Sequence, residues 1–213
     1  MNITVRALTP ELVSDYFDFF DNRAFADGSP FYPCYCNAFN MSREQIKSDL
    51  FARAEALGGG DEAWKTALRE SAREMVLSGA IKGCLAYDGA LAVGWCNAND
   101  RMSYYRVGEF DLDSLPEDDP APDCPGKGIV RSVVCFEISP GYRGMGIAGL
   151  LLERVCADAA KEGYSFVEAY PNDGDSGALS FTGPLRLYEK AGFKEHARRG
   201  SVIVMRKELS AAD

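Results

Sequence analysis

The sequence has no long apolar segment and a single histidine, His196. No run approaches the ~20 consecutive apolar residues that a membrane-spanning helix needs, so no membrane role is expected. The N-terminal residues MNITVR lack the apolar core of a signal peptide, which predicts a cytoplasmic protein. No internal repeat or low-complexity tract is visible either.

Positive charge is also scarce, because 23 Lys and Arg stand against 32 Asp and Glu, a net charge of −9. A protein that binds nucleic acid needs a basic face, so no nucleic-acid partner is expected. An acidic surface suits a cationic substrate, although acidity also serves solubility alone. The 7 cysteines are odd in number and follow no export signal, which predicts thiols and no disulfide framework.

The most informative segment is ISPGYRGMGIAG, residues 138–149. It predicts an apolar strand that ends at Ile138, a glycine-rich turn and then an amphipathic helix. The first turn of a helix has unpaired N–H groups and carries the positive end of the helix dipole. Glycines at 144 and 146 let the main chain come close to a phosphate. The loop is therefore expected to hold an anion, with the charge of Arg143 beside it.

Two other phosphate-binding loops fit this segment less well. A Walker loop ends in Gly-Lys-Ser/Thr, and neither the lysine nor the hydroxyl is present here. The dinucleotide fingerprint G-x-G-x-x-G matches at Gly144, Gly146 and Gly149, but only with the turn shifted into the helix. That match alone is weak.

The segment resembles motif A of the GNAT superfamily of N-acetyltransferases, whose pattern Arg/Gln-x-x-Gly-x-Gly/Ala is met by Arg143, Gly146 and Ala148. A second segment, PLRLYEKAGF at residues 184–193, is similar to the helix of the family's motif B. Two motifs in the right order are far rarer by chance than either alone. The resemblance covers the chain from about residue 80 to 209 and is poor before that.

The resemblance implies an α/β (α+β) fold, with a mixed, largely antiparallel central sheet and helices on both faces. Residue patterns give a compatible order: a strand, helices, a hairpin at Asp88-Gly89, a central strand over 129–138, a helix, a strand over 166–170, a helix and two final strands. In the family, the strands that correspond to 129–138 and 166–170 splay apart.

We expect a single domain over residues 1–213, with a helical insertion at about 41–79 and an acidic loop at about 111–127. The loop is either a solvated connection or a flap over the substrate.

The resemblance also implies acetyl-CoA as the co-substrate and no metal. In the family, the amides of the motif A loop hold the pyrophosphate, and the central strand pairs with pantetheine through main-chain hydrogen bonds. Carried over to this sequence, the cofactor-binding residues are Phe136, Ile138, Arg143, Gly144, Met145, Gly146, Ile147 and Ala148.

Acyl transfer to an amine needs a base and an acid for the departing thiolate. The match to motif B implies Tyr188 as the acid, against the plain alternative of a core aromatic. Glu168 lies among apolar residues and matches the glutamate that serves as base in the family's ribosomal-protein acetyltransferases. Glu137, also inside an apolar strand, is the second candidate base. An edge or solvent-facing position would explain either glutamate without catalysis.

The segment FYPCYCNAF, residues 31–39, combines aromatics with two close thiols, Cys34 and Cys36. A metal site is weakly indicated, because C-x-C offers two ligands at most. The segment is otherwise a wall of the acceptor pocket or a loop packed on the core. Tyr35 is a candidate substrate-binding residue, together with Trp95 and Asn97 from the hairpin. This combination of segments is similar to a bacterial subgroup of the family.

The expected function is an acetyl-CoA-dependent N-acetyltransferase that acts on a primary amine of a small molecule or peptide, by direct transfer with a glutamate base and a tyrosine acid. The first alternative is a non-catalytic acyl-CoA-binding sensor module, which would need neither Glu168 nor Tyr188. The second is a metal or redox protein built on Cys34 and Cys36. A homodimer remains an option for its assembly.

Overall fold

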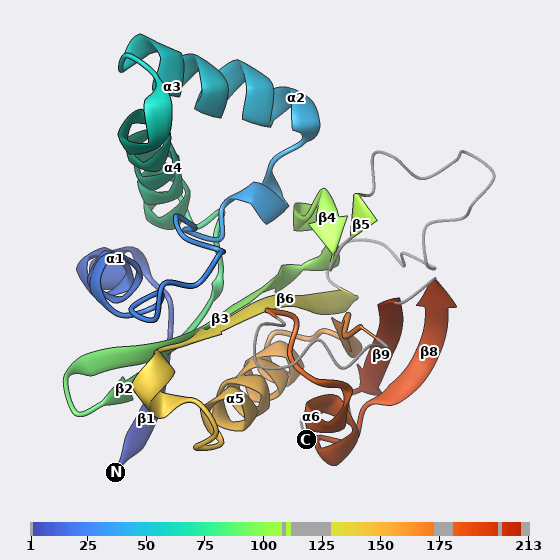
Figure 1. The fold of residues 1–213 in the computed structure, drawn as a ribbon. Helices are drawn as coiled ribbons and strands as arrows, with labels where there is room; N and C mark the ends of the chain where they lie inside the picture. The colour runs from blue at the N-terminus through green and yellow to red at the C-terminus, as the bar shows by residue number, and fades with distance from the viewer. Residues whose placement is uncertain (1, 108–109, 112–128, 173–180, 200–201, 210–213) are drawn as a thin grey trace.

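The fold is built on one seven-stranded sheet, in the order β1-β2-β3-β6-β7-β9-β8 (Figure 1). The computed structural model describes residues 2–107, 110–111, 129–172, 181–199 and 202–209. Neighbouring strands are antiparallel except for β6 and β7, which are parallel. This mixed, largely antiparallel sheet with helices on both faces confirms the predicted fold class.

The strands follow the predicted order along the chain. They are β1 (Ile3–Ala7), β2 (Gly83–Asp88), β3 (Leu91–Asp100), β6 (Val130–Ile138), β7 (Phe166–Ala169), β8 (Lys194–Arg199) and β9 (Val202–Glu208). The hairpin of β2 and β3 turns at Gly89, whose φ of 63° suits glycine. Two short strands that the sequence patterns did not indicate, β4 (Arg106–Val107) and β5 (Phe110–Asp111), form a separate pair.

Helices from the N-terminal part of the chain cover one face of the sheet. A 3-10 turn (Pro10–Leu12) leads into α1 (Val13–Asn22), and α2 (Arg43–Gln45), a π-helical turn (Ile46–Phe51), α3 (Ala52–Ala56) and α4 (Gly60–Leu77) follow. In Figure 1, α2, α3 and the far end of α4 extend beyond the sheet. Ser42 and Gln45 form a capping box at the start of α2. Gly59 is the N-cap residue of α4.

The core on this face is aromatic. Tyr16 and Phe20 of α1 pack against Trp95 of β3, and the ring of Tyr16 meets Trp95 edge to face at 5.1 Å between centroids. Large aromatic rings fill the space between α1 and the sheet, because each buries a wide apolar area.

Helices α5 (Ile147–Lys161) and α6 (Leu185–Lys190) cover the opposite face. The buried stripe of α5 consists of Ile147, Leu151 and Val155, which are four residues apart as the sequence pattern predicts. Gly163, with a φ of 82°, lies just beyond the end of the helix. The short α6 begins directly after Pro184, in agreement with the motif B pattern.

Some expectations fall on residues that the structure does not describe. They belong to the acidic loop expected at about 111–127, of which only residue 111 is described. In the described ranges, no helix combines the length and the apolar character that crossing a membrane requires.

Candidate active site

The sheet opens between β6 and β7. The two strands pair only from Val130 with Phe166 to Val133 with Ala169, although β6 continues to Ile138. The far half of β6 keeps β3 as its neighbour on one side and has lost β7 on the other. This opening matches the splay that the family resemblance implies, and it leaves one edge of a central strand open to a ligand.

A pocket of about 140 Å³ lies at this opening. It is formed by a loop near the N-terminus, the end of β6, the start of α5 and the segment before α6. The lining residues are Ser29, Phe31, Phe136, Glu137, Ile138, Arg143, Ala148, Phe181, Gly183 and Pro184. Four of the predicted site residues around motif A therefore meet in one cavity with Glu137.

The motif A loop presents unused donors. Gly144 and Gly146 have φ values of 77° and 82°, a conformation that glycine adopts at little cost. Gly146 is the N-cap of α5. Within the described part of the chain, the N–H groups of residues 144–148 have no hydrogen-bond acceptor. With the positive end of the helix dipole behind them, these amides can bind an anion such as a phosphate.

Arg143 differs from the expectation that its charge stands beside the phosphate. Its Nε donates to the carbonyl of Ile138 at 3.0 Å, and its terminal nitrogens reach Asp27 at 2.5 Å and Glu137 at 3.3 Å. Asp27 and Glu137 attract the guanidinium away from the loop amides. Arg143 thus connects the phosphate loop to the pocket carboxylate.

Glu137 combines burial with weak pairing. Its residue is 9% exposed, and the contact to Arg143 at 3.3 Å is the ion pair that the described residues give it. Burial raises the pKa of Glu137 to about 7, and the nearby Arg143 only partly offsets this rise. A carboxyl group with a pKa near neutrality in a pocket is suited to accept a proton.

Glu168, the sequence-favoured base, lies elsewhere on the same face. Its Oε2 accepts the hydroxyl of Tyr170 at 3.0 Å, and its Oε1 accepts Nε of Arg206 at 2.7 Å. It pairs in register with Ser132, five residues before Glu137, which corresponds to roughly 16 Å of strand. The structure therefore does not bring the two glutamates together, and it gives Glu168 saturated contacts outside the pocket lining.

Tyr188 packs behind the pocket wall, next to the lining residue Gly183. The residue is fully buried, and its hydroxyl donates to the carbonyl of Thr182. A Cβ at Gly183, which lines the pocket, would stand 3.3 Å from the Tyr188 hydroxyl oxygen. Burial raises the pKa of Tyr188 well above its usual value, so the hydroxyl is protonated at neutral pH.

The main-chain groups proposed for pantetheine already have partners in this structure. The N–H of Phe136 donates to the carbonyl of Phe181 at 2.6 Å, and the carbonyl of Ile138 accepts Arg143. Residue 181 thus occupies a position on the open edge of β6 that a ligand's carbonyl would take. The contact arises because the unpaired N–H on β6 needs an acceptor.

Tyr35, Trp95 and Asn97, which the sequence offers as substrate contacts, lie in the core and do not line this pocket. Each is at most 1% exposed. The hydroxyl of Tyr35 donates to Asp21 at 2.6 Å, and the amide of Asn97 donates to the carbonyl of Cys36 at 3.1 Å. Buried polar atoms need hydrogen-bond partners, and these two contacts supply them from within the protein, without a substrate.

The thiols of the N-terminal segment also pack inward. The Sγ atoms of Cys36 and Cys135 are 3.6 Å apart, and the Cys34 sulfur accepts the N–H of Cys36. Both Cys34 and Cys36 have a pKa raised well above the usual value, Cys34 by a hydrogen bond with Cys36 and by burial, Cys36 mainly by its hydrogen bond to Cys135. Among the described residues, no group of three His, Cys, Asp or Glu side chains is arranged to hold a metal.

Sequence reasoning missed part of the pocket. Ser29 and Phe181, which line it, and Asp27, which pairs with the lining residue Arg143, come from loops whose patterns carry no periodic signal. Phe31 belongs to the aromatic segment that the sequence singled out, but the segment's contact to the pocket is made by this residue and not by Tyr35.

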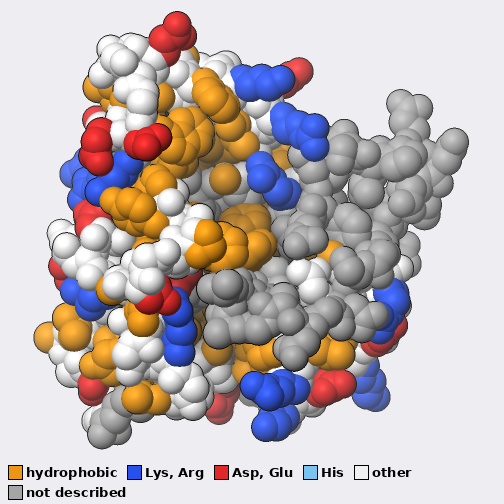
Figure 2. Space-filling view, in the orientation of Figure 1, with side chains coloured by type: hydrophobic (Ala, Val, Ile, Leu, Met, Phe, Trp, Pro, Cys, Tyr) orange, Lys and Arg blue, Asp and Glu red, His pale blue; other side chains and the backbone are white. Residues whose placement is uncertain are grey.

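On the face drawn in Figure 2, hydrophobic side chains gather around a hollow below α2 and α3.

The comparisons with known proteins agree on one family. The model of the Acetyltransferase (GNAT) family matches residues 60–193. That range contains the motif A loop, Glu137, Glu168 and Tyr188. No curated protein sequence matches the chain.

Solved structures share the fold at low sequence identity. An acetyltransferase of the GNAT family from Streptococcus pneumoniae is 13% identical, with a TM-score of 0.53 over 98% of this chain and 100% of that one. The PaiA N-acetyltransferase from Thermoplasma acidophilum, in complex with coenzyme A, is 16% identical, with a TM-score of 0.51 over 98% and 100%. The yncA protein from Salmonella typhimurium, with its cofactor acetyl-CoA, is 13% identical, with a TM-score of 0.51 over 100% and 97%.

Proposed function

We propose that this chain, which belongs to the Acetyltransferase (GNAT) family, is an acetyl-CoA-dependent N-acetyltransferase that acts on a primary amine. One observation carries the proposal. A carboxyl group with a pKa of about 7, that of Glu137, opens into the same pocket as a helix N-terminus whose amides are unpaired within the described chain. The first group suits proton transfer from an amine, and the second suits a phosphate-bearing donor.

The residues of the loop fit coenzyme A. The N–H groups of residues 144–148 would hold the pyrophosphate, with glycine at 144 and 146 allowing close approach. The proteins PaiA and yncA carry coenzyme A and acetyl-CoA in their structures, which supports the same ligand here. When bound, acetyl-CoA supplies the activated acetyl group. Pantetheine would pair with Phe136 and Ile138, and it would have to replace the carbonyl of Phe181.

Glu137 is the proposed general base. A primary ammonium must lose a proton before its nitrogen can attack, and a carboxylate of near-neutral pKa accepts that proton without holding it too tightly. Arg143 favours the charged form of Glu137 and so keeps the pKa from rising further. Glu168 is better explained as a structural charge, because Arg206 and Tyr170 already satisfy it.

Tyr188 is the proposed general acid. Its hydroxyl is protonated at neutral pH and lies next to Gly183 at the pocket wall. The contact to the carbonyl of Thr182 orients the hydroxyl, and a small rotation would redirect its proton toward a thiolate in the pocket. This role rests on the match to motif B together with that position.

The acceptor is proposed to be an amine attached to an apolar body. Glu137 is the carboxylate in the pocket lining, and the rings of Phe31 and Phe181 meet edge to face at its mouth, 5.5 Å between centroids. Aromatic rings bind apolar groups and also attract ammonium through their faces.

The decisive experiment is a thiol-release assay with acetyl-CoA over a panel of primary amines, run beside calorimetry of acetyl-CoA binding. An enzyme releases coenzyme A in proportion to an acetylated amine found by mass spectrometry. Saturable binding without turnover on any amine would favour the alternative, a non-catalytic acyl-CoA sensor. Absence of binding to well-folded protein would contradict both.

A further inference from the structure

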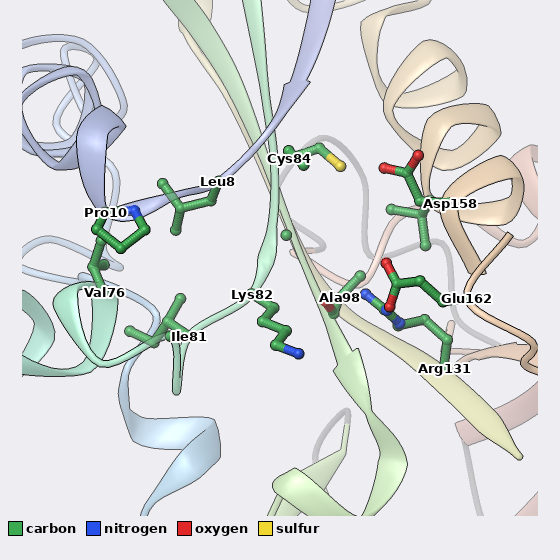
Figure 3. Close-up of a pocket in the computed structure, with 14 residues that line it drawn as sticks. Leu8, Pro10, Val76, Ile81, Lys82, Cys84, Ala98, Arg131, Asp158 and Glu162 are labelled. Carbon is green, nitrogen blue, oxygen red and sulfur yellow. Dashed lines mark hydrogen bonds and ion pairs between the residues drawn. The ribbon is translucent and has the colours of Figure 1, made fainter. Parts of the chain in front are cut away.

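A second pocket lies at the other end of the sheet (Figure 3). It has a volume of about 230 Å³ and lies among the starts of β2 and β6 and the C-terminal half of α5. Its lining contains two cations, Lys82 and Arg131, and two carboxylates, Asp158 and Glu162. Arg131 precedes Glu137 by six residues on β6, so roughly 20 Å of strand separate this pocket from the candidate active site.

Both carboxylates of this pocket already have partners. Asp158 accepts Nε of Arg154 at 2.7 Å, one turn earlier on α5. Glu162 forms an ion pair with Nη2 of Arg131, and Figure 3 draws the two side chains pointing toward each other. The negative charges in the pocket are therefore engaged within the protein and offer little to a cationic ligand.

Hydrogen-bond donors, by contrast, are left over. Arg131 is 6% exposed, and its Nε is buried with no acceptor in the part of the chain that the structure describes. Its Nη1 reaches the carbonyl of Ala98 at 3.4 Å, and the guanidinium lies over the ring of Tyr164, 4.6 Å from the centroid. Lys82 is exposed at the pocket, and no described carboxylate lies within ion-pair distance of its ammonium. A buried donor that lacks an acceptor lowers stability, so an incoming acceptor is favoured here.

Apolar side chains line the pocket between its charged groups. Cys84, Ala98 and Val155 belong to the core cluster beneath α5 and line the cavity. Burial raises the pKa of Cys84 to about 12, so its thiol stays neutral and acts as a small apolar group. A ligand seated between the two cations would rest its body on these side chains.

We propose that this pocket binds a small aliphatic carboxylate. The carboxylate accepts hydrogen bonds from Nζ of Lys82 and Nε of Arg131, and the aliphatic body packs against Cys84, Ala98 and Val155. The unused groups are donors, which selects a carboxylate over an amine of the same shape. Since a water takes about 30 Å³, the cavity accommodates a molecule of roughly six to eight non-hydrogen atoms.

The test compares butyrate, butylamine and butanol, which share a chain length and differ in the polar group. Each is titrated into the full chain, with calorimetry and amide chemical shifts as the two readouts. We expect butyrate to saturate in the millimolar range, because a small ligand gains little binding free energy per atom. It should bind at least about tenfold more tightly than butylamine or butanol, because only its carboxylate accepts charge-assisted hydrogen bonds from the two cations. The shifts should cluster at the starts of β2 and β6 and in the last turns of α5.

Lys82→Met removes one of the two donors, and because Lys82 is exposed the variant should fold normally. It should weaken butyrate binding by about tenfold. Lys47→Met, which changes an exposed lysine on the helical segment away from the pocket, is the matched control and should leave binding unchanged. Equal binding of butyrate and butylamine, shifts outside the pocket, no saturation, or an unaltered Lys82→Met variant would each overturn the proposal.

Discussion

The two halves of β6 hold buried charge in opposite ways. Over Val130–Val133 the strand is flanked by β3 and β7, and the carboxylate opposite Ser132, that of Glu168, is satisfied by Arg206 and Tyr170. Over the second half, β7 is absent and Glu137 keeps one ion pair at 3.3 Å with a pKa of about 7.

The difference shows why the role of a buried glutamate, structural or catalytic, cannot be read from its sequence position. A continuous sheet can surround a charge with fixed donors that satisfy its hydrogen-bonding capacity. An opened sheet desolvates the charge but leaves room on one side, so the group keeps a proton that it can exchange. Saturated contacts indicate structure, and incomplete contacts next to a cavity indicate chemistry.

The sharpest way to break this comparison is to neutralise each glutamate in turn. Glu137→Gln should lower kcat/KM for acetyl transfer by about 10²–10⁴ because the base is lost. Acetyl-CoA binding, measured by calorimetry, should stay near the wild-type value. Glu168→Gln should retain most of the activity of the folded fraction but lower the free energy of unfolding by roughly 3 kcal/mol, because Arg206, whose side chain is 14% exposed, loses its charged partner. An equal loss of activity in both variants would contradict the assignment.

Two buried tyrosines extend the same comparison. Tyr188 and Tyr170 are both fully buried with hydrogen-bonded hydroxyls, but Tyr188 is the one next to a residue of the candidate active site, Gly183. Tyr188→Phe should lower kcat by about tenfold to a hundredfold if its hydroxyl supplies the proton. Tyr170→Phe should cost stability and leave kcat within about twofold. Steady-state kinetics on both variants tests this, and an unchanged kcat for Tyr188→Phe removes it from the mechanism.

The two ends of α5 provide a matched pair of glycines. Gly146 and Gly163 both have a φ of 82° and open space where a Cβ would be. Substitution by Ala should strain both equally, at about 1 kcal/mol. Only Gly146→Ala distorts the amides of the phosphate loop, so it alone should weaken acetyl-CoA binding, by about tenfold or more. Calorimetry on the two variants decides this, and equal binding would place the phosphate elsewhere.

The pH dependence of stability also separates the two glutamates. Because the pKa of Glu137 rises from 4.5 to about 7 on folding, the native state binds the proton more tightly than the unfolded chain. Its contribution to stability is present below pH 4.5 and is lost as pH rises to about 7, by on the order of 3 kcal/mol. Glu137→Gln should flatten this part of the unfolding curve, measured by denaturant titration at several pH values.

Activity should show the opposite trend with pH. Since the charged carboxylate is the form that accepts a proton, kcat/KM should rise with pH and level off above about 7. A profile without this limb, or the same limb in the Glu137→Gln variant, would point to another base.

Local patterns predicted much of the fold. The stripe of Ile147, Leu151 and Val155 indicated α5, and the Asp88-Gly89 turn indicated the hairpin, because both depend on neighbours in the chain. The π-helical turn at Ile46–Phe51 and the cap at Gly59 were not predicted, since each depends on a few tenths of a kcal/mol of local geometry that tertiary packing overrides.

The amino-acid sequence by itself determined the family, the order of the strands and helices and the position of the motif A loop, because motif and periodicity are properties of adjacent residues. Tertiary structure decided which glutamate faces a cavity and sent Trp95 and Asn97 into the core. It also brought Phe31 and Phe181 to the pocket and Asp27 to Arg143. The reason is physical. Desolvation and ion pairing depend on distances across the fold, and these are set where β6 and β7 separate.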